Sequence, residues 1–141
     1  MKILVIEDHA VELKLTDLVL STAGHDVRAV ETAEQAFAAI QEDRPRLILL
    51  DLDLPGMDGL ALVRQLKADP DTRDIHVVAV TCYPEEYPQA AVLAAGCDAH
   101  LLKPINTPEL SGQLTAVAEA GDAPPRKNQR NLSHEHPDCR R

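Results

Sequence analysis

The chain has 141 residues, of which 45% are hydrophobic, and this is enough for one domain with a buried core. Its net charge of −9 is uneven, because residues 1–121 carry 9 Lys/Arg and 20 Asp/Glu while residues 122–141 carry 5 and 3. An acidic body repels a phosphate backbone, so direct nucleic-acid binding by it is not expected. Three cysteines at wide spacing form no disulfide framework, and no apolar run approaches the roughly 18 residues of a membrane span. We therefore expect a cytoplasmic protein with no membrane insertion and no signal peptide.

Five short apolar runs alternate with helical patterns along the chain. The runs that predict strands are residues 2–6, 26–30, 46–50, 76–80 and 99–103. The apolar residues that recur at helical spacing after them are Val11, Leu15, Leu18 and Val19, then Ala33, Ala36, Phe37 and Ile40, then Leu60, Val63 and Leu66, then Ala90, Leu93 and Ala94, and finally Leu110, Leu114 and Val117. Five strand–helix units of this kind predict an α/β fold with a parallel sheet and helices on both faces.

The periodic pattern ends near residue 120. The last predicted helix begins at Thr107-Pro108-Glu109, where Thr107 suits the N-cap and Pro108 the first helical position. The segment that follows is polar, contains Pro-Pro and has no apolar period. We therefore expect a domain over residues 1–121 and a polar tail over 122–141 that is flexible unless a partner orders it.

Polar side chains stand at the carboxyl ends of the predicted strands, where open α/β sheets bind ligands. Glu7 and Asp8 follow the first strand, Asp51 the third and Thr81 the fourth, and Lys103 ends the fifth. Clustered carboxylates repel one another unless a hard cation such as Mg²⁺ neutralises them. A carboxylate can also accept a phosphoryl group, whose spread negative charge a lysine and a hydroxyl then stabilise. The pattern thus suits Mg²⁺-dependent phosphoryl transfer.

Four motifs carry a family resemblance. They are "IED" at 6–8, "LLDLDLPGMDG" at 49–59, "AVT" at 79–81 and "LLKP" at 101–104. In this order and spacing they resemble the receiver domain of two-component response regulators, the CheY-like fold, over residues 2 to about 120. The resemblance implies a flavodoxin-like (βα)5 sandwich with strand order 2-1-3-4-5, and Mg²⁺ as cofactor. It also implies that the phosphoryl group comes from a sensor histidine kinase or a histidine phosphotransfer protein.

The same resemblance assigns the acidic residues. Asp51 would be the phosphoacceptor, and Asp8 and Asp51 would ligate Mg²⁺ directly. Glu7 would reach the metal through water, and the backbone carbonyl of Asp53 would be the third protein ligand. The Asp53 carboxylate is expected to tune the access of water to the phosphoryl group, whereas Asp58 is expected to cap the next helix.

The resemblance also assigns the remaining site residues. Thr81 would bind a phosphoryl oxygen and shift on activation, and Lys103 would pair with the phosphoryl group, with the peptide bond to Pro104 cis. His100 stands where many receivers carry an aromatic residue that swings inward as the threonine moves. Two interpretations of His100 stay open: a switch residue that titrates near neutrality, or an exposed strand residue.

The resulting hypothesis is a stand-alone receiver that is no enzyme beyond its own phosphorylation and dephosphorylation. It would signal by binding a protein through the face from the fourth strand to the fifth helix, or by onward phosphotransfer. One alternative is a pseudo-receiver that binds without phosphorylation, although no site residue is missing. The other is a haloacid-dehalogenase-like phosphatase with Asp51 as nucleophile and Asp53 as general acid. In those enzymes the DxD motif follows the first strand, and this chain has no room for their cap.

Overall fold

The computed structural model describes residues 1–54, 58–103, 105 and 107–119. Its elements alternate in chain order: β1 (Lys2–Ile6), α1 (Ala10–Thr22), β2 (Asp26–Val30), α2 (Ala33–Glu42), β3 (Leu47–Asp51), α3 (Gly59–Ala68), β4 (His76–Thr81), α4 (Gln89–Ala95), β5 (Ala99–Leu102) and α5 (Thr107–Glu119). Every strand predicted from the apolar runs is present, with ends shifted by one residue at most. The predicted boundary at residue 121 and the tail 122–141 lie outside the described residues.

The five strands form one parallel sheet in the order β2-β1-β3-β4-β5, as the resemblance implied. The strands β1, β3 and β4 are buried along almost their whole length, which their continuous apolar sequences require. Because all strands run the same way, their carboxyl ends meet at one edge of the sheet.

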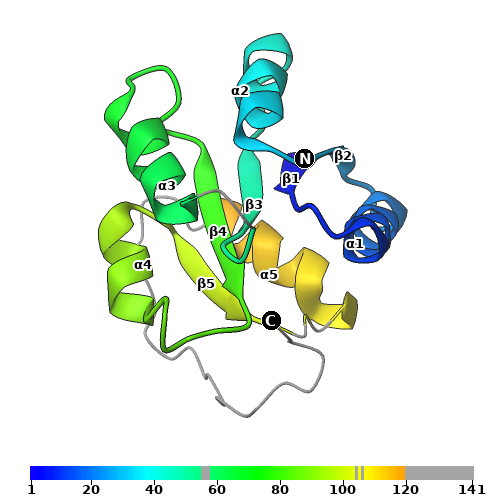
Figure 1. The fold of residues 1–141 in the computed structure, drawn as a ribbon. Helices are drawn as coiled ribbons and strands as arrows, with labels where there is room; N and C mark the ends of the chain where they lie inside the picture. Colours follow the sequence, from blue (N-terminus) through cyan, green and yellow to red (C-terminus); the bar gives the residue numbers. More distant parts are fainter. Residues whose placement is uncertain (55–57, 104, 106, 120–141) are drawn as a thin grey trace.

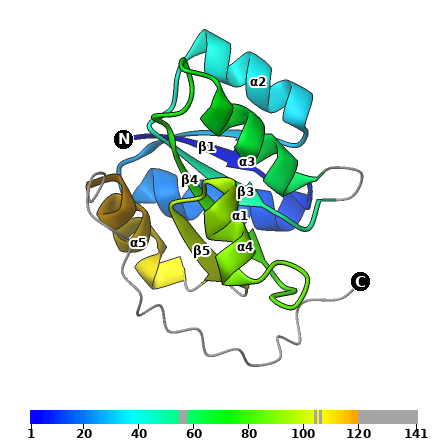
Figure 2. The same cartoon turned by 90° about the vertical axis from the view of Figure 1, so that its left-hand side faces the viewer.

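The helices cover both faces of this sheet. Helices α2, α3 and α4 lie on one face and α1 and α5 on the other (Figures 1 and 2). Alternate residues of each strand point to opposite faces, so Leu4 and Ile48 join the core under α2–α4 while Ile3 and Leu49 join the core under α1 and α5. The fold is thus the three-layer flavodoxin-like sandwich.

Helix α1 forms where the apolar spacing predicts a helix, but the apolar stripe does not face the core. Val11, Leu15 and Leu18 are exposed by 71%, 49% and 64% respectively. A second stripe, through Leu13 and Leu20, packs against the sheet instead. The helix therefore leaves three large apolar side chains on the surface, which we call the α1 stripe.

Asp58 and Gly96 terminate two of the helices, α3 at its start and α4 at its end. The carboxylate of Asp58 accepts hydrogen bonds from the Leu60 and Ala61 amides at 3.1 and 3.2 Å, so Asp58 caps α3 as expected. Gly96 ends α4 in the left-handed region, with φ of 117°, and a Cβ there would lie 2.7 Å from the Lys67 side chain. Asp58 thus fixes the start of α3, and Gly96 lets the end of α4 approach the Lys67 side chain of α3.

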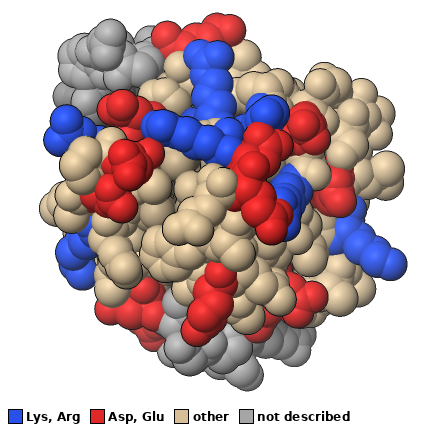
Figure 3. Space-filling model, turned by 90° about the horizontal axis from the view of Figure 1, so that it is seen from above, with Lys and Arg blue, Asp and Glu red and all other residues tan. Residues whose placement is uncertain are grey.

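The surface agrees with the composition. On the face seen from above in Figure 3, lysine and arginine side chains lie next to aspartate and glutamate side chains. Two exposed ion pairs of the described residues are Lys2–Asp43 at 2.6 Å and Arg28–Glu42 at 2.7 Å. Among the described residues, no helix has the length and apolar content needed to cross a membrane.

Candidate functional site

Three polar side chains are buried at the carboxyl edge of the sheet. Glu7 directly follows β1, and Asp51 and Thr81 are the last residues of β3 and β4; their exposed fractions are 8%, 5% and 0%. The strand ladder continues past these ends, since the Leu52 amide donates to the Val80 carbonyl at 2.8 Å. Burial of ionisable groups in a rigid strand edge is costly, so each of these groups needs a partner.

Lys103 is the partner of the acids. Its backbone amide donates to the Thr81 carbonyl at 3.0 Å, which holds the residue beside the end of β4. The Lys103 Nζ then lies 3.0 Å from Asp51, 3.3 Å from Glu12, and 3.9 Å from both Glu7 and Asp53. Burial alone would lower the pKa of Lys103, but Asp51 and the other carboxylates outweigh it and raise that pKa above its ordinary value.

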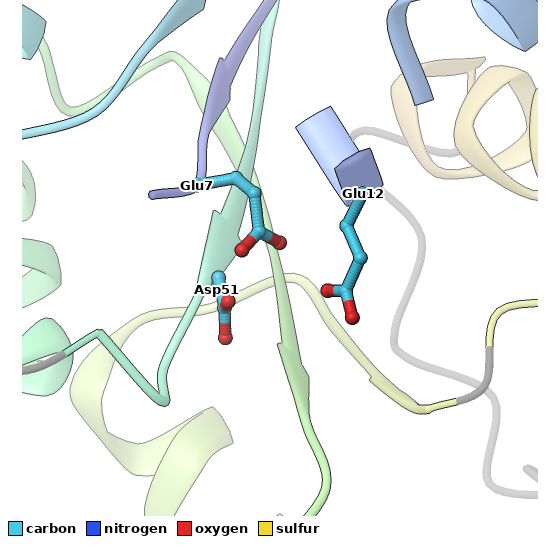
Figure 4. A group of neighbouring side chains, drawn as sticks. All are labelled: Glu7, Glu12 and Asp51. Atoms are coloured by element: carbon cyan, nitrogen blue, oxygen red, sulfur yellow. The ribbon is translucent and has the colours of Figure 1, made fainter. Parts of the chain in front are cut away.

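Four carboxyl groups lie within 4 Å of the Lys103 ammonium. Glu7, Glu12 and Asp51 each place one oxygen within 4.8 Å of the others, and their side chains converge from the residue after β1, from α1 and from β3 (Figure 4). Burial, aided by the neighbouring Asp51, raises the pKa of Glu7 to about 8, although Lys103 and the His9 amide at 3.1 Å act in the opposite direction. Three oxygen ligands in mutual repulsion form a donor set that suits a hard divalent cation such as Mg²⁺.

Glu12 was not singled out by the sequence analysis, whereas Asp8 was. Glu12 lies in the first turn of α1 and belongs to the group of converging carboxylates. The Asp8 side chain is exposed and lies outside that group, so its direct ligation of a metal stays a prediction. A signal for Glu12 does exist in the sequence, because the first turn of a helix that directly follows a strand lies above the strand ends.

The Asp53 carboxylate contacts the end of β4. Its two oxygens accept hydrogen bonds from the Thr81 hydroxyl at 2.7 Å and from the Cys82 amide at 2.8 Å. The Asp53 amide donates to Asp51 at 2.8 Å, and the Tyr83 amide donates to the Thr81 Oγ1 at 2.9 Å. Burial raises the pKa of Asp53 above its ordinary value, although these two hydrogen bonds to its carboxylate lower it. The role of its carbonyl as a metal ligand stays a prediction.

His100 is buried, with 8% of its surface exposed, so its interpretation as an exposed strand residue is wrong. It pairs with Ala79 in the sheet and therefore points to the same face as Ala79, toward the core under α2–α4. Its Nε2 has no hydrogen-bond partner among the described residues, and burial lowers its pKa. Its action as a switch stays a prediction. Pro104, and with it the predicted cis peptide bond, lies outside the described residues.

Comparison with known proteins places this site in a family. The model of the response regulator receiver domain matches residues 3–115. The chain is 37% identical over 115 residues to the phosphate regulon transcriptional regulatory protein PhoB of Pseudomonas aeruginosa, covering 82% of this chain and 50% of PhoB. It is 31% identical over 106 residues to the polar-differentiation response regulator DivK of Brucella anthropi, covering 75% of this chain and 86% of DivK.

A solved structure supports the same assignment. The receiver domain of the sensor histidine kinase PA1611 from Pseudomonas aeruginosa, with a magnesium ion coordinated in its active site cleft, superposes with a TM-score of 0.74 at 28% identity. The match covers 84% of this chain and 97% of that domain. The family model, the strand order and the carboxylates around Lys103 at the carboxyl ends of the strands all point to the same family. The chain therefore belongs to the response regulator receiver family of two-component signalling systems, whose domains signal rather than act as classical enzymes.

Proposed function

We propose that this protein accepts a phosphoryl group on Asp51, with Mg²⁺, from a phosphohistidine of a sensor histidine kinase or a histidine phosphotransfer protein. The observation that carries the proposal is the position of Asp51. The residue is 5% exposed, and its carboxylate lies 3.0 Å from the Lys103 ammonium and belongs to a group of three converging carboxylates. This environment combines a nucleophile, a fixed cation and a donor set for a divalent metal.

The transfer exchanges one bond for another. An Asp51 carboxylate oxygen attacks phosphorus, the new P–O bond forms, and the P–N bond of the phosphohistidine breaks. The imidazole leaves with the electron pair of that bond and takes up a proton. Bound Mg²⁺ would neutralise charge on the phosphoryl oxygens and the carboxylates.

Residues of the site would stabilise the product. Lys103 would pair with one phosphoryl oxygen, and the Thr81 hydroxyl and the Cys82 amide would donate to the others. In hydrolysis, water attacks phosphorus, the bond to Asp51 breaks, and inorganic phosphate leaves the regenerated carboxylate.

The expected metal ligands are Asp51, Asp8, Glu7 through water and the Asp53 carbonyl, as the resemblance implies. The convergence of Glu12 with Glu7 and Asp51 adds a further carboxylate that can hold the cation directly or through water. Mg²⁺ keeps several waters and uses one or two carboxylates, so Glu12 and Asp8 need not both ligate it.

Acetyl phosphate with Mg²⁺ tests the phosphorylation itself. The wild-type protein should gain one phosphoryl group that hydroxylamine removes, because an acyl phosphate is labile to this nucleophile. Asp51→Asn should abolish the labelling. Asp58→Asn is a matched control seven positions along the chain, since Asn caps a helix about as well as Asp and α3 should stay intact. Labelling that survives in Asp51→Asn contradicts the proposal, and no labelling of the wild type favours a pseudo-receiver.

The α1 stripe supports a helical phosphodonor. Val11 directly precedes Glu12, so the stripe begins at the edge of the site, and a protein that delivers a phosphoryl group to Asp51 would cover it. Exposed apolar side chains at helical spacing suit packing against another helix. Leu15→Ser should therefore slow transfer from a phosphorylated histidine protein and leave labelling by acetyl phosphate unchanged. A transfer rate from the phosphorylated histidine protein that is the same in Leu15→Ser as in the wild type would exclude this docking surface.

The output is proposed to be a protein contact through the face from β4 to α5, or onward phosphotransfer, in the cytoplasm. Thr81 and Lys103 lie at the ends of β4 and β5, and buried His100 lies within β5, so a change at the phosphoryl group would reach this face first. The chain spans about half the length of PhoB and most of the length of DivK. Pull-down of partners with phosphorylated protein and with Asp51→Asn as control would test the stand-alone role.

A further inference from the structure

The Asp53 carboxylate already occupies the groups that should bind the phosphoryl oxygens. It accepts from the Thr81 hydroxyl at 2.7 Å and the Cys82 amide at 2.8 Å, and it lies 3.9 Å from the Lys103 ammonium. One anionic side chain thus contacts the hydroxyl, the amide and the cation that the proposed function assigns to another anion. The Asp53 carboxylate and a phosphoryl group both need donors, so the same hydroxyl, amide and ammonium cannot make all of their bonds to both anions at once.

We propose that the Asp53 carboxylate is an internal competitor of the phosphoryl group, which holds Thr81 and the Cys82 amide at rest and must release them when Asp51 is phosphorylated. The inference rests on the proposed function. It makes Asp53 a positioning residue that sets how readily the site takes up a phosphoryl group, in addition to any role of its backbone carbonyl.

The surroundings of Thr81 make this competition effective. Thr81 is fully buried, so its hydroxyl cannot turn to bulk water when it loses a partner. The backbone amide of Asp53 is fixed to Asp51 at 2.8 Å, which keeps the carboxylate within reach of β4 after it has been displaced. Glu7 and Glu12 also pair with Lys103, but among the described residues the carboxylate that accepts the Thr81 hydroxyl is that of Asp53.

The matched pair Asp53→Asn and Asp53→Ala separates this contact from simple charge removal. Both variants remove one negative charge near Lys103, but an Asn oxygen can still accept the Thr81 hydrogen bond. Titration with beryllium trifluoride at saturating Mg²⁺ measures affinity for a phosphoryl mimic. Release of the donors should tighten this affinity about tenfold in Asp53→Ala and about threefold in Asp53→Asn, where tenfold corresponds to about 1.4 kcal/mol.

Thr81→Val completes a double-mutant cycle. Valine keeps the shape of threonine and removes the hydroxyl, so the gain caused by Asp53→Ala should fall from about tenfold to about threefold in this background. Without the mimic, the amide proton signal of Cys82 should move upfield in Asp53→Ala, because its hydrogen bond to a carboxylate is lost. This signal reports the contact directly and does not depend on phosphorylation.

The outcomes separate the two proposals. The competitor proposal would be overturned if Asp53→Asn and Asp53→Ala raised the affinity for beryllium trifluoride equally, or if Thr81→Val left the effect of Asp53→Ala unchanged. Either result would indicate that Asp53 acts by electrostatic repulsion alone. If the wild-type protein binds no mimic and is not labelled at Asp51, the proposed function fails instead. Circular dichroism of each variant shows whether the fold is retained, and an unshifted Cys82 amide in a folded Asp53→Ala would also count against the competitor.

Discussion

Replacement of Lys103 by methionine should have opposite effects on stability and on metal affinity. Lys103→Met keeps most of the length of the side chain and removes the Lys103 ammonium, which lies within 4 Å of Asp51, Glu12, Glu7 and Asp53. In the variant, these four carboxyl groups lose the positive charge that Lys103 places between them. The variant should be less stable in EDTA, should bind Mg²⁺ more tightly and should lose most of its phosphorylation by acetyl phosphate.

The size of the stability loss follows from the geometry. At an effective dielectric constant of about 20, the Lys103–Asp51 pair at 3.0 Å contributes about 5.5 kcal/mol of attraction before the cost of desolvation. Removing one partner of a buried pair costs about 3–5 kcal/mol net. The lower value applies here, because the raised pKa of Glu7 keeps that group largely protonated near neutrality and Glu12 is 42% exposed. We expect a loss of about 3 kcal/mol in EDTA.

Urea unfolding with and without Mg²⁺ measures this loss. A divalent cation neutralises the carboxylates in place of the ammonium, so saturating Mg²⁺ should reduce the deficit of Lys103→Met to about 1 kcal/mol. Lys67→Met is the matched control. Lys67 is also largely buried and lies 3.5 Å from Asp98, but it contacts carbonyls of the segment between α3 and β4 and none of the site carboxylates.

A deficit in Lys103→Met that is the same in EDTA and in Mg²⁺ would contradict this electrostatic role of the lysine. In that case the lysine would stabilise the fold by packing and not by its charge. A loss of stability in Lys67→Met that Mg²⁺ also reduces would contradict the reasoning as well. It would show that the metal stabilises the chain away from the carboxylates around Lys103.

Three further predictions concern single side chains. Burial lowers the pKa of His100, so the unfolded chain binds a proton more readily than the folded protein, and the stability due to neutral His100 should be complete above pH 6.5 and should fall below it. In His100→Phe, the free energies of urea unfolding at pH 5.5 and pH 7.5 should differ less than in the wild type. The same difference in both proteins would exclude His100 as its cause. Asp58→Ala should cost about 1 kcal/mol, because two amides of α3 lose their acceptor, whereas Asp58→Asn should cost almost nothing; equal losses in thermal melts would disprove the cap. Glu12→Gln should weaken Mg²⁺ binding about tenfold in calorimetric titration, or about 1.4 kcal/mol, and unchanged affinity would remove Glu12 from the metal site.

Much of the fold could be predicted because the apolar pattern and the strand ends depend on local sequence. Continuous apolar runs form the buried strands β1, β3 and β4, and the residue that ends each run is brought to one edge by the parallel topology. This is why the amino-acid sequence alone groups Asp51, Thr81 and Lys103, although they are far apart in the chain. Helix α1 shows the limit, since two apolar stripes fit one helix and spacing alone does not show which of them packs against the sheet.

The orientation of the second carboxylate in "DLD" was beyond prediction for a different reason. A residue two positions after a strand lies in a loop, and the direction of its side chain depends on which donors the neighbouring strand presents. Here β4 ends in a buried hydroxyl followed by an amide, and the Asp53 carboxylate satisfies both. Burying Thr81 without a partner would cost about 1–3 kcal/mol, so some acceptor had to meet it at rest. If Asp53 is that acceptor, the resting site already contains an anion, and phosphorylation exchanges one anion for another instead of filling an empty pocket. A receiver built in this way should therefore bind a phosphoryl mimic more tightly when alanine replaces Asp53, because the Thr81 hydroxyl and the Cys82 amide are then free of the resting anion.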